Sequence, residues 1–259
     1  MLRFLKWFAG IGLVLLTGTA TLGALSYPSI AAAACPGCYG FEPIAERVYV
    51  GEDMGTAERV RFHSDLKAAR DTVARVLEPT AARPFLFACS TNSCDARIGG
   101  HGDKGARAET HTTPFFTVVR FGPRGIDRTI LTHELAHVTL HEIVGAHAVM
   151  DGRFPAWLNE GIAVIVSDDS RYLRPGDSAQ ERCIGPADEP LPESPFDWGP
   201  MAGRDPTSYA RAACAALHWL EVHGGIPGLL GRLRQSAVSG EPVIGVEVQV
   251  PASRESLDS

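Results

Sequence analysis

The segment TILTHELAHVTLHEIV, residues Thr129–Val144, contains the pattern H-E-x-x-H at His133, Glu134 and His137. Residues four apart lie on one face of a helix, so the two histidines can hold one cation between them. Glu134 is offset by one residue and would lie beside the metal, where it can accept a proton from a water molecule that the metal activates. The pattern therefore predicts a zinc site, against the alternative of a solvated helix that is rich in histidine.

A catalytic zinc site needs a third protein ligand. His141 lies on the same face, but one turn further along and about 12 Å from His133 by helix rise, which is too far to share one ion. We expect it to support the site or to cap the helix. The better candidate is Glu160 in PAWLNEGIA, on the next predicted helix and 23 residues after His137. The segment between them, GAHAVMDGRFP, is long enough to return the second helix antiparallel to the first.

The pair HELAH and WLNEGIA resembles the gluzincin clan of zinc peptidases, in particular small exported members built around a thermolysin-like catalytic core. The resemblance is specific over about residues 120–166. It implies that Zn²⁺ is held by His133, His137 and Glu160. It also implies that a strand before the first helix, here Phe115–Phe121, pairs with the substrate backbone.

The sequence departs from the clan's pattern in two features. The clan has an acidic residue four positions after its glutamate ligand, where it orients a ligand histidine, and this chain has Val164. Asp168 or Asp169 is the possible substitute. The G-x-M-x-N stretch of the aminopeptidase branch is missing from the sequence, so no anchor for a substrate amino terminus is predicted.

A later helix supplies the remaining catalytic candidate. Many gluzincins carry a tyrosine or histidine there that donates a hydrogen bond to the developing oxyanion, and such a donor contributes about 2.7–4 kcal/mol in comparable sites. The resemblance puts this role on Tyr209, at the start of the predicted Ser208–Gly224 helix, with His218 behind it. Ordinary packing at a helix start is an equal alternative for Tyr209.

These features predict a zinc-dependent metallopeptidase with a peptide or protein substrate. Two rival functions remain open: a peptidase-fold module that binds peptides without turnover, and a zinc hydrolase that acts on a non-peptide bond. The formal charge of −6 and the lack of a basic stripe argue against a nucleic-acid partner. The sequence does not specify an oligomeric state.

The amino-terminal segment predicts export. Arg3 and Lys6 precede the uncharged, mostly apolar run Trp7–Leu25, and Ala32 and Ala34 have the spacing of a signal-peptidase site. The apolar run is also close to the ~20 residues that span a bilayer, so an uncleaved signal anchor that attaches the protein to the membrane is an alternative. Lipidation at the following cysteine is a third possibility. We expect three regions: a leader over 1–34, a peptidase domain over 35–240 and a tail over 241–259.

All six cysteines follow the leader, which agrees with an extracytoplasmic or periplasmic location. The short loops CPGC and CSTNSC suggest the pairs Cys35–Cys38 and Cys89–Cys94, which leaves Cys183 with Cys214. Fifteen pairings of six cysteines are possible in principle. The competing interpretation is a structural zinc held by the first four cysteines.

The order of the predicted strands and helices indicates an α+β fold, with a small mixed or antiparallel sheet followed by a helical half. These elements must position the candidate site residues. Strands are expected at Arg47–Val50, Pro84–Cys89 and Phe115–Phe121, and helices at Thr56–Glu78, over the H-E-x-x-H segment behind Asp127 as its cap, at Trp157–Val166, at Ser208–Gly224 and at Gly228–Val238. Long loops are expected at Asn92–Gly105 and over 168–206.

Overall fold

The computed structural model describes residues 27–185 and 190–245. The first 26 residues of the predicted leader and the end of the predicted tail lie outside them. The chain divides into two compact units, and the divisions fall inside two helices, after Ala69 and after Glu134. Unit 1 holds the chain up to Ala69 together with Ala81–Glu134, and unit 2 holds Arg70–Thr80 and the chain from Leu135 on.

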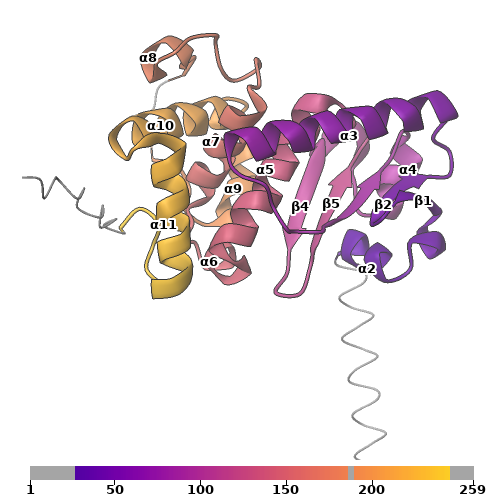
Figure 1. Ribbon diagram of the computed structural model, residues 1–259. Helices are drawn as coiled ribbons and strands as arrows, with labels where there is room; N and C mark the ends of the chain where they lie inside the picture. Colours follow the sequence, from indigo (N-terminus) through magenta and orange to yellow (C-terminus); the bar gives the residue numbers. More distant parts are fainter. Residues whose placement is uncertain (1–26, 186–189, 246–259) are drawn as a thin grey trace, which may run out of the picture. The chain divides into compact units, whose positions relative to one another are not determined.

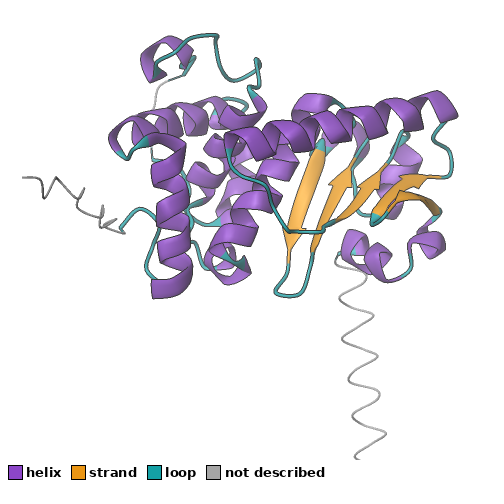
Figure 2. Cartoon of the chain, in the orientation of Figure 1, coloured by secondary structure: helices purple, strands orange, loops and turns teal. Residues whose placement is uncertain are grey.

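Unit 1 is built on a five-stranded mixed sheet with the order β1-β2-β3-β5-β4 (Figures 1 and 2). The strands are β1 (Phe41–Ala45), β2 (Val48–Gly51), β3 (Phe85–Ala88), β4 (Ala108–Thr112) and β5 (Thr117–Phe121). The three central strands run parallel, and β1 and β4 pair antiparallel at the two edges. The α+β class and the mixed sheet predicted from the sequence are confirmed, but β1 and β4 were not predicted.

Helices of unit 1 bury apolar side chains against this sheet. They are α2 (Pro28–Ala34), the first part of α3 (Thr56–Val76) and α4 (Asn92–Arg97), with 3-10 turns at Pro36–Tyr39 and Gly102–Lys104. Pro28 stands in the first turn of α2, where a missing N–H costs nothing. Ala32 is fully buried in a cluster with Phe41, Phe87 and Val118. Residues 28–34, within the range predicted as leader, therefore pack against the sheet.

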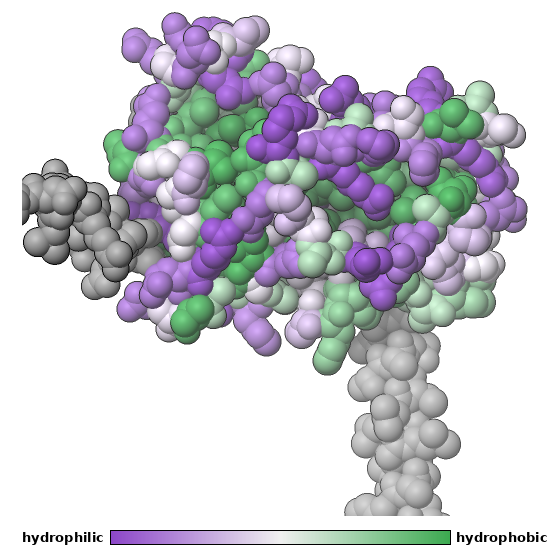
Figure 3. All heavy atoms as spheres, viewed as in Figure 1, coloured by the Kyte–Doolittle hydropathy of each residue, from purple (hydrophilic) through white to green (hydrophobic). Residues whose placement is uncertain are grey.

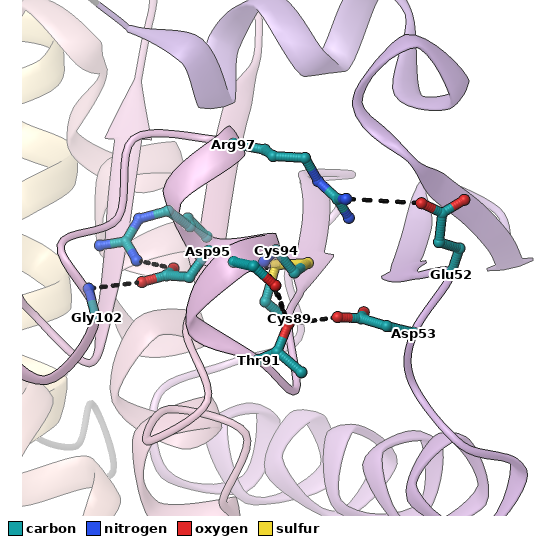
Figure 4. The surroundings of a disulfide bond; sticks show 10 residues. Glu52, Asp53, Cys89, Thr91, Cys94, Asp95, Arg97 and Gly102 are labelled. Atoms are coloured by element: carbon teal, nitrogen blue, oxygen red, sulfur yellow. Dashed lines mark hydrogen bonds and ion pairs between the residues drawn. A yellow bond between two sulfur atoms is a disulfide. The ribbon is translucent and has the colours of Figure 1, made fainter.

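The segment Asn92–Gly105, expected to be a loop, contains α4 instead. Thr91 caps this helix, since its Oγ1 accepts a hydrogen bond from the Cys94 amide at 3.2 Å. The Cys89–Cys94 disulfide ties α4 to the end of β3 (Figure 4). The buried Asp95 of α4 then pairs with Arg120 of β5 at 2.5 Å, so a disulfide and an ion pair both hold α4 to the sheet.

Replacing Arg120 with Met is expected to lower the free energy of unfolding by about 3–5 kcal/mol, because it leaves the buried Asp95 carboxylate without its countercharge. Both side chains of this pair are at most 2% exposed. The measurement is urea unfolding with the disulfides intact. The matched control is Arg83→Met, which removes an exposed pair with Glu46 and should cost less than about 1 kcal/mol. Equal effects of the two substitutions would contradict the structural role of Arg120.

Unit 2 is helical. Its elements are the end of α3, the second part of α5 (Arg128–Val144), α6 (Ala146–Met150), α7 (Ala156–Ser167), α8 (Ala179–Arg182), α9 (Pro195–Ala202), α10 (Ser208–Val222) and α11 (Gly225–Ser239). The region 168–206, expected to be a loop, holds α8 and α9. The closest packing joins α7 to α10: a Cβ at Gly161 would lie 2.3 Å from the Ala212 carbonyl oxygen, so only glycine permits this approach. Because Gly161 follows Glu160, the same packing fixes the position of that glutamate.

All six cysteines are paired as predicted. Cα–Cα distances are 5.3 Å for Cys35–Cys38, 5.5 Å for Cys89–Cys94 and 5.2 Å for Cys183–Cys214, and no cysteine is free. The paired thiols are unavailable for the alternative four-cysteine zinc site. Three disulfides are typical of an oxidising compartment. Among the described helices, none has the length and apolar character needed to cross a membrane.

Candidate metal centre

Three residues of the predicted metal site converge in the structure. One ligand atom from each of His133, His137 and Glu160 lies within 4.8 Å of the others. Both histidines are on α5 and are buried, and Glu160 on α7 is partly buried. The predicted ligand set is therefore one that could hold a metal ion.

The sequence forms α5 for local reasons. Asp127 accepts a hydrogen bond from the Ile130 amide at 3.1 Å, as a helix cap does. The helix then runs to Val144, and apolar residues such as Leu131 and Leu140 are fully buried. Histidines and a glutamate buried on the same helix are costly unless they have partners, so their burial favours a functional arrangement.

His137 is oriented as a metal-binding histidine would be. Its Nδ1 lies 2.9 Å from Asn159 Oδ1, and because that amide oxygen only accepts, Nδ1 carries the proton. The unprotonated Nε2 then faces Glu160 Oε2 at 3.5 Å. A tetrahedral metal with bonds of about 2.0–2.2 Å, as zinc has, places neighbouring ligand atoms roughly 3.3–3.6 Å apart, so these two atoms are at ligand spacing.

Asn159 was not predicted as a site residue. A ligand histidine usually donates its second ring N–H to an acceptor that fixes its tautomer, and Asn159 does this for His137. The signal was its place directly before Glu160 in WLNEG. Asp168 and Asp169, the possible substitutes for the clan's acidic residue, pair with Arg182 and Arg171, respectively. Both aspartates follow the last residue of α7, and a role for either in orienting a ligand histidine stays a prediction.

Glu134 is buried and held by a neighbour. Thr110 of β4 donates a hydrogen bond from its Oγ1 to Glu134 Oε2 at 2.7 Å. Glu134 is not one of the three converging ligands, as its offset from the histidines predicts. One carboxylate oxygen is thus occupied by Thr110, and the orientation of the group is restricted. Thr110 was missed because no strand was predicted around it.

His141 is buried one turn beyond His137, with the two ring centroids 5.6 Å apart. Its pKa is lowered to about 3, first by burial and then by His137, while a hydrogen bond with Asn159 and the charge of Glu160 act in the opposite direction. It is therefore neutral near pH 7. The ligand group does not include it, as the helix rise predicts.

The ring of Tyr209 packs among aromatic side chains. It stacks on Tyr172 with centroids 5.2 Å apart and meets Trp198 edge-on at 5.5 Å. These contacts are those of the packing alternative, and its role as an oxyanion donor stays a prediction. His218 is exposed and lies 3.5 Å from Glu221, so it faces solvent.

The strand that the resemblance assigns to substrate binding is enclosed within the sheet. The predicted strand Phe115–Phe121 is β5, which begins only at Thr117 and pairs with β3 on one side and β4 on the other. Both of its hydrogen-bonding edges are occupied, so it cannot pair with a peptide. The outermost strand on this side is β4, which carries Thr110.

The chain matches no protein-family model, no curated protein and no solved structure. Its function must be inferred from its own residues.

Proposed function

We propose that the protein is an exported zinc-dependent metallopeptidase with a thermolysin-like catalytic core. The observation that carries this proposal is the convergence of His133, His137 and Glu160. Two imidazoles and one carboxylate are a ligand set of catalytic zinc sites, which keep a further position open. The three disulfides support the exported location, because such bonds persist in oxidising compartments.

The chemistry follows from the residues around that group. Zinc bound there supplies Lewis acidity and lowers the pKa of water towards neutrality. Glu134 removes a proton from the attacking water as its oxygen bonds to the carbonyl carbon of the scissile peptide. Glu134 then delivers that proton to the leaving nitrogen as the C–N bond breaks. Tyr209 is proposed to donate to the developing oxyanion, in keeping with the resemblance.

Glu134 favours an enzyme over the binding module, and only the substrate distinguishes the peptidase from the non-peptide hydrolase. A module that only binds zinc and peptide needs no base beside the ligands. The deciding experiment is incubation of the zinc-loaded protein with a mixed peptide library and a panel of esters. Peptide cleavage supports the proposal, cleavage of esters alone supports the non-peptide hydrolase, and full zinc without any turnover supports the binding module.

The outer edge of β4 is the proposed place for the substrate backbone. An extended peptide can add to a free sheet edge through main-chain hydrogen bonds. Thr110 lies on this strand and contacts Glu134, so a peptide paired there would lie near the base. This assignment replaces the one for the Phe115–Phe121 strand.

Replacing Thr110 with Val is expected to lower kcat about 10–100-fold with little change in KM, because it removes a hydrogen bond to the charged base while keeping the side chain's shape. Thr110→Ser restores the hydroxyl and should recover most of the activity. The control is Thr117→Val on β5, which should have little effect. Steady-state kinetics on one cleaved peptide provides the test, and a serine variant as impaired as the valine variant would disprove the positioning role.

A further inference from the structure

The loop between β4 and β5 presents an exposed aromatic ring. Phe115 is 91% exposed, the highest value among the large hydrophobic side chains that the structure describes. The neighbouring Phe116 turns the other way and meets Phe85 edge-on, with centroids 5.8 Å apart. The loop is thus fixed to the sheet by one phenylalanine and presents the other to its surroundings.

The backbone amides of this loop are hydrogen-bonded within the loop. The Thr113 amide donates to the Phe116 carbonyl at 3.0 Å, and Thr113 Oγ1 accepts from the amides of Phe115 and Phe116 at 3.2 and 3.1 Å. Pro114 has no N–H, so every amide from Thr113 to Phe116 is accounted for. The stretch from 112 to 117 is also uncharged. Because these amides are already bonded, moving the loop out of water costs less than it would for a loop with free amides, since unsatisfied backbone groups are a main cost in an apolar medium.

The described chain begins beside this loop. Tyr27 is half exposed, and its ring meets that of His111 on β4 edge-on at 5.8 Å. Helix α2 contacts β5, and in Figure 1 α2 and the β4–β5 loop lie at the same end of the sheet of unit 1. In Figure 3 pale and green residues lie along this edge, whereas strongly hydrophilic residues follow α3 on the opposite side.

We propose that the β4–β5 loop rests in the interfacial region of a lipid bilayer, with Phe115 as the inserted side chain. The partner is lipid because the sequence just before Tyr27 contains the apolar run Trp7–Leu25, which is predicted to reach a membrane. One ring binds a bilayer too weakly by itself, as even a single acyl chain does. A membrane tether that ends beside the loop raises the effective concentration of Phe115 at the bilayer surface. The weak contact of the ring is then enough to set the orientation of unit 1 on the bilayer. This inference does not depend on the peptidase activity.

The test uses the full chain in phosphatidylcholine vesicles, with and without dibrominated acyl chains that quench tryptophan. Phe115→Trp is compared with the wild type, whose four tryptophans give the background. The emission added by the new tryptophan should fall by about half in brominated vesicles, because an interfacial side chain lies about 5–10 Å into the headgroup and acyl boundary. The matched control is Val60→Trp, an exposed position on α3 of the same unit, which should not be quenched.

Two results would overturn the proposal. One is an unquenched tryptophan at position 115, and the other is equal quenching at positions 115 and 60. A further variant, Phe115→Ser, separates lipid from a second copy of the chain. Self-association of the wild type that Phe115→Ser abolishes, without quenching at position 115, would assign the ring to a protein interface instead.

Discussion

Replacing Glu134 with Gln is expected to remove nearly all peptide hydrolysis while zinc and fold are retained. The same carboxylate takes the proton from water and returns it to the leaving amine, and general acid–base steps contribute about 10²–10⁴-fold each. Glutamine keeps the size of the side chain and an oxygen that can still accept from Thr110. The measurement is cleavage of a mixed peptide library, with zinc content determined for each protein.

The control for this substitution is Glu142→Gln. Glu142 lies on the same helix but is exposed and accepts a hydrogen bond from Thr80, so the loss of its charge should leave hydrolysis close to the wild-type rate. If Glu134→Gln cleaves as fast as the wild type, the proposed base is wrong. If the wild type with full zinc cleaves nothing, the binding-module alternative gains instead.

Replacing Glu160 with Gln is expected to weaken zinc binding by more than about 100-fold, because two histidines remain where three ligands converged. Asn159→Ala should have a smaller effect, about 10–100-fold, since it leaves all three ligands in place and removes the acceptor that orients His137. His141→Ala should leave zinc binding nearly intact. Competition with a chelator of known affinity, together with zinc content, ranks the three variants.

Two outcomes of this measurement would each contradict a different assignment. Full zinc occupancy in Glu160→Gln under chelator competition would refute the ligand assignment. Equal affinities of Asn159→Ala and His141→Ala would refute the orienting role of Asn159 and leave the ligand assignment standing. Neither result depends on peptide hydrolysis, so the metal site can be tested separately from the activity.

Local sequence was enough to predict the parts of this protein that depend on short spacing. His133 and His137 share a helix face because they are four residues apart, and α5 begins behind its Asp127 cap as expected. The pairs Cys35–Cys38 and Cys89–Cys94 join residues only three and five positions apart. Glu160 was found through a motif on the following helix rather than through geometry.

Tertiary structure decided which strands and polar side chains surround the candidate site. Sheet order depends on pairing between distant segments, so the sequence could not reveal that β5 is enclosed and that β4 is the edge strand. Thr110 contacts Glu134 across 24 residues, and Asn159 contacts His137 across 22. Each side chain is an ordinary polar residue in its own segment, and folding brings it within hydrogen-bond distance of a group that local spacing does not specify.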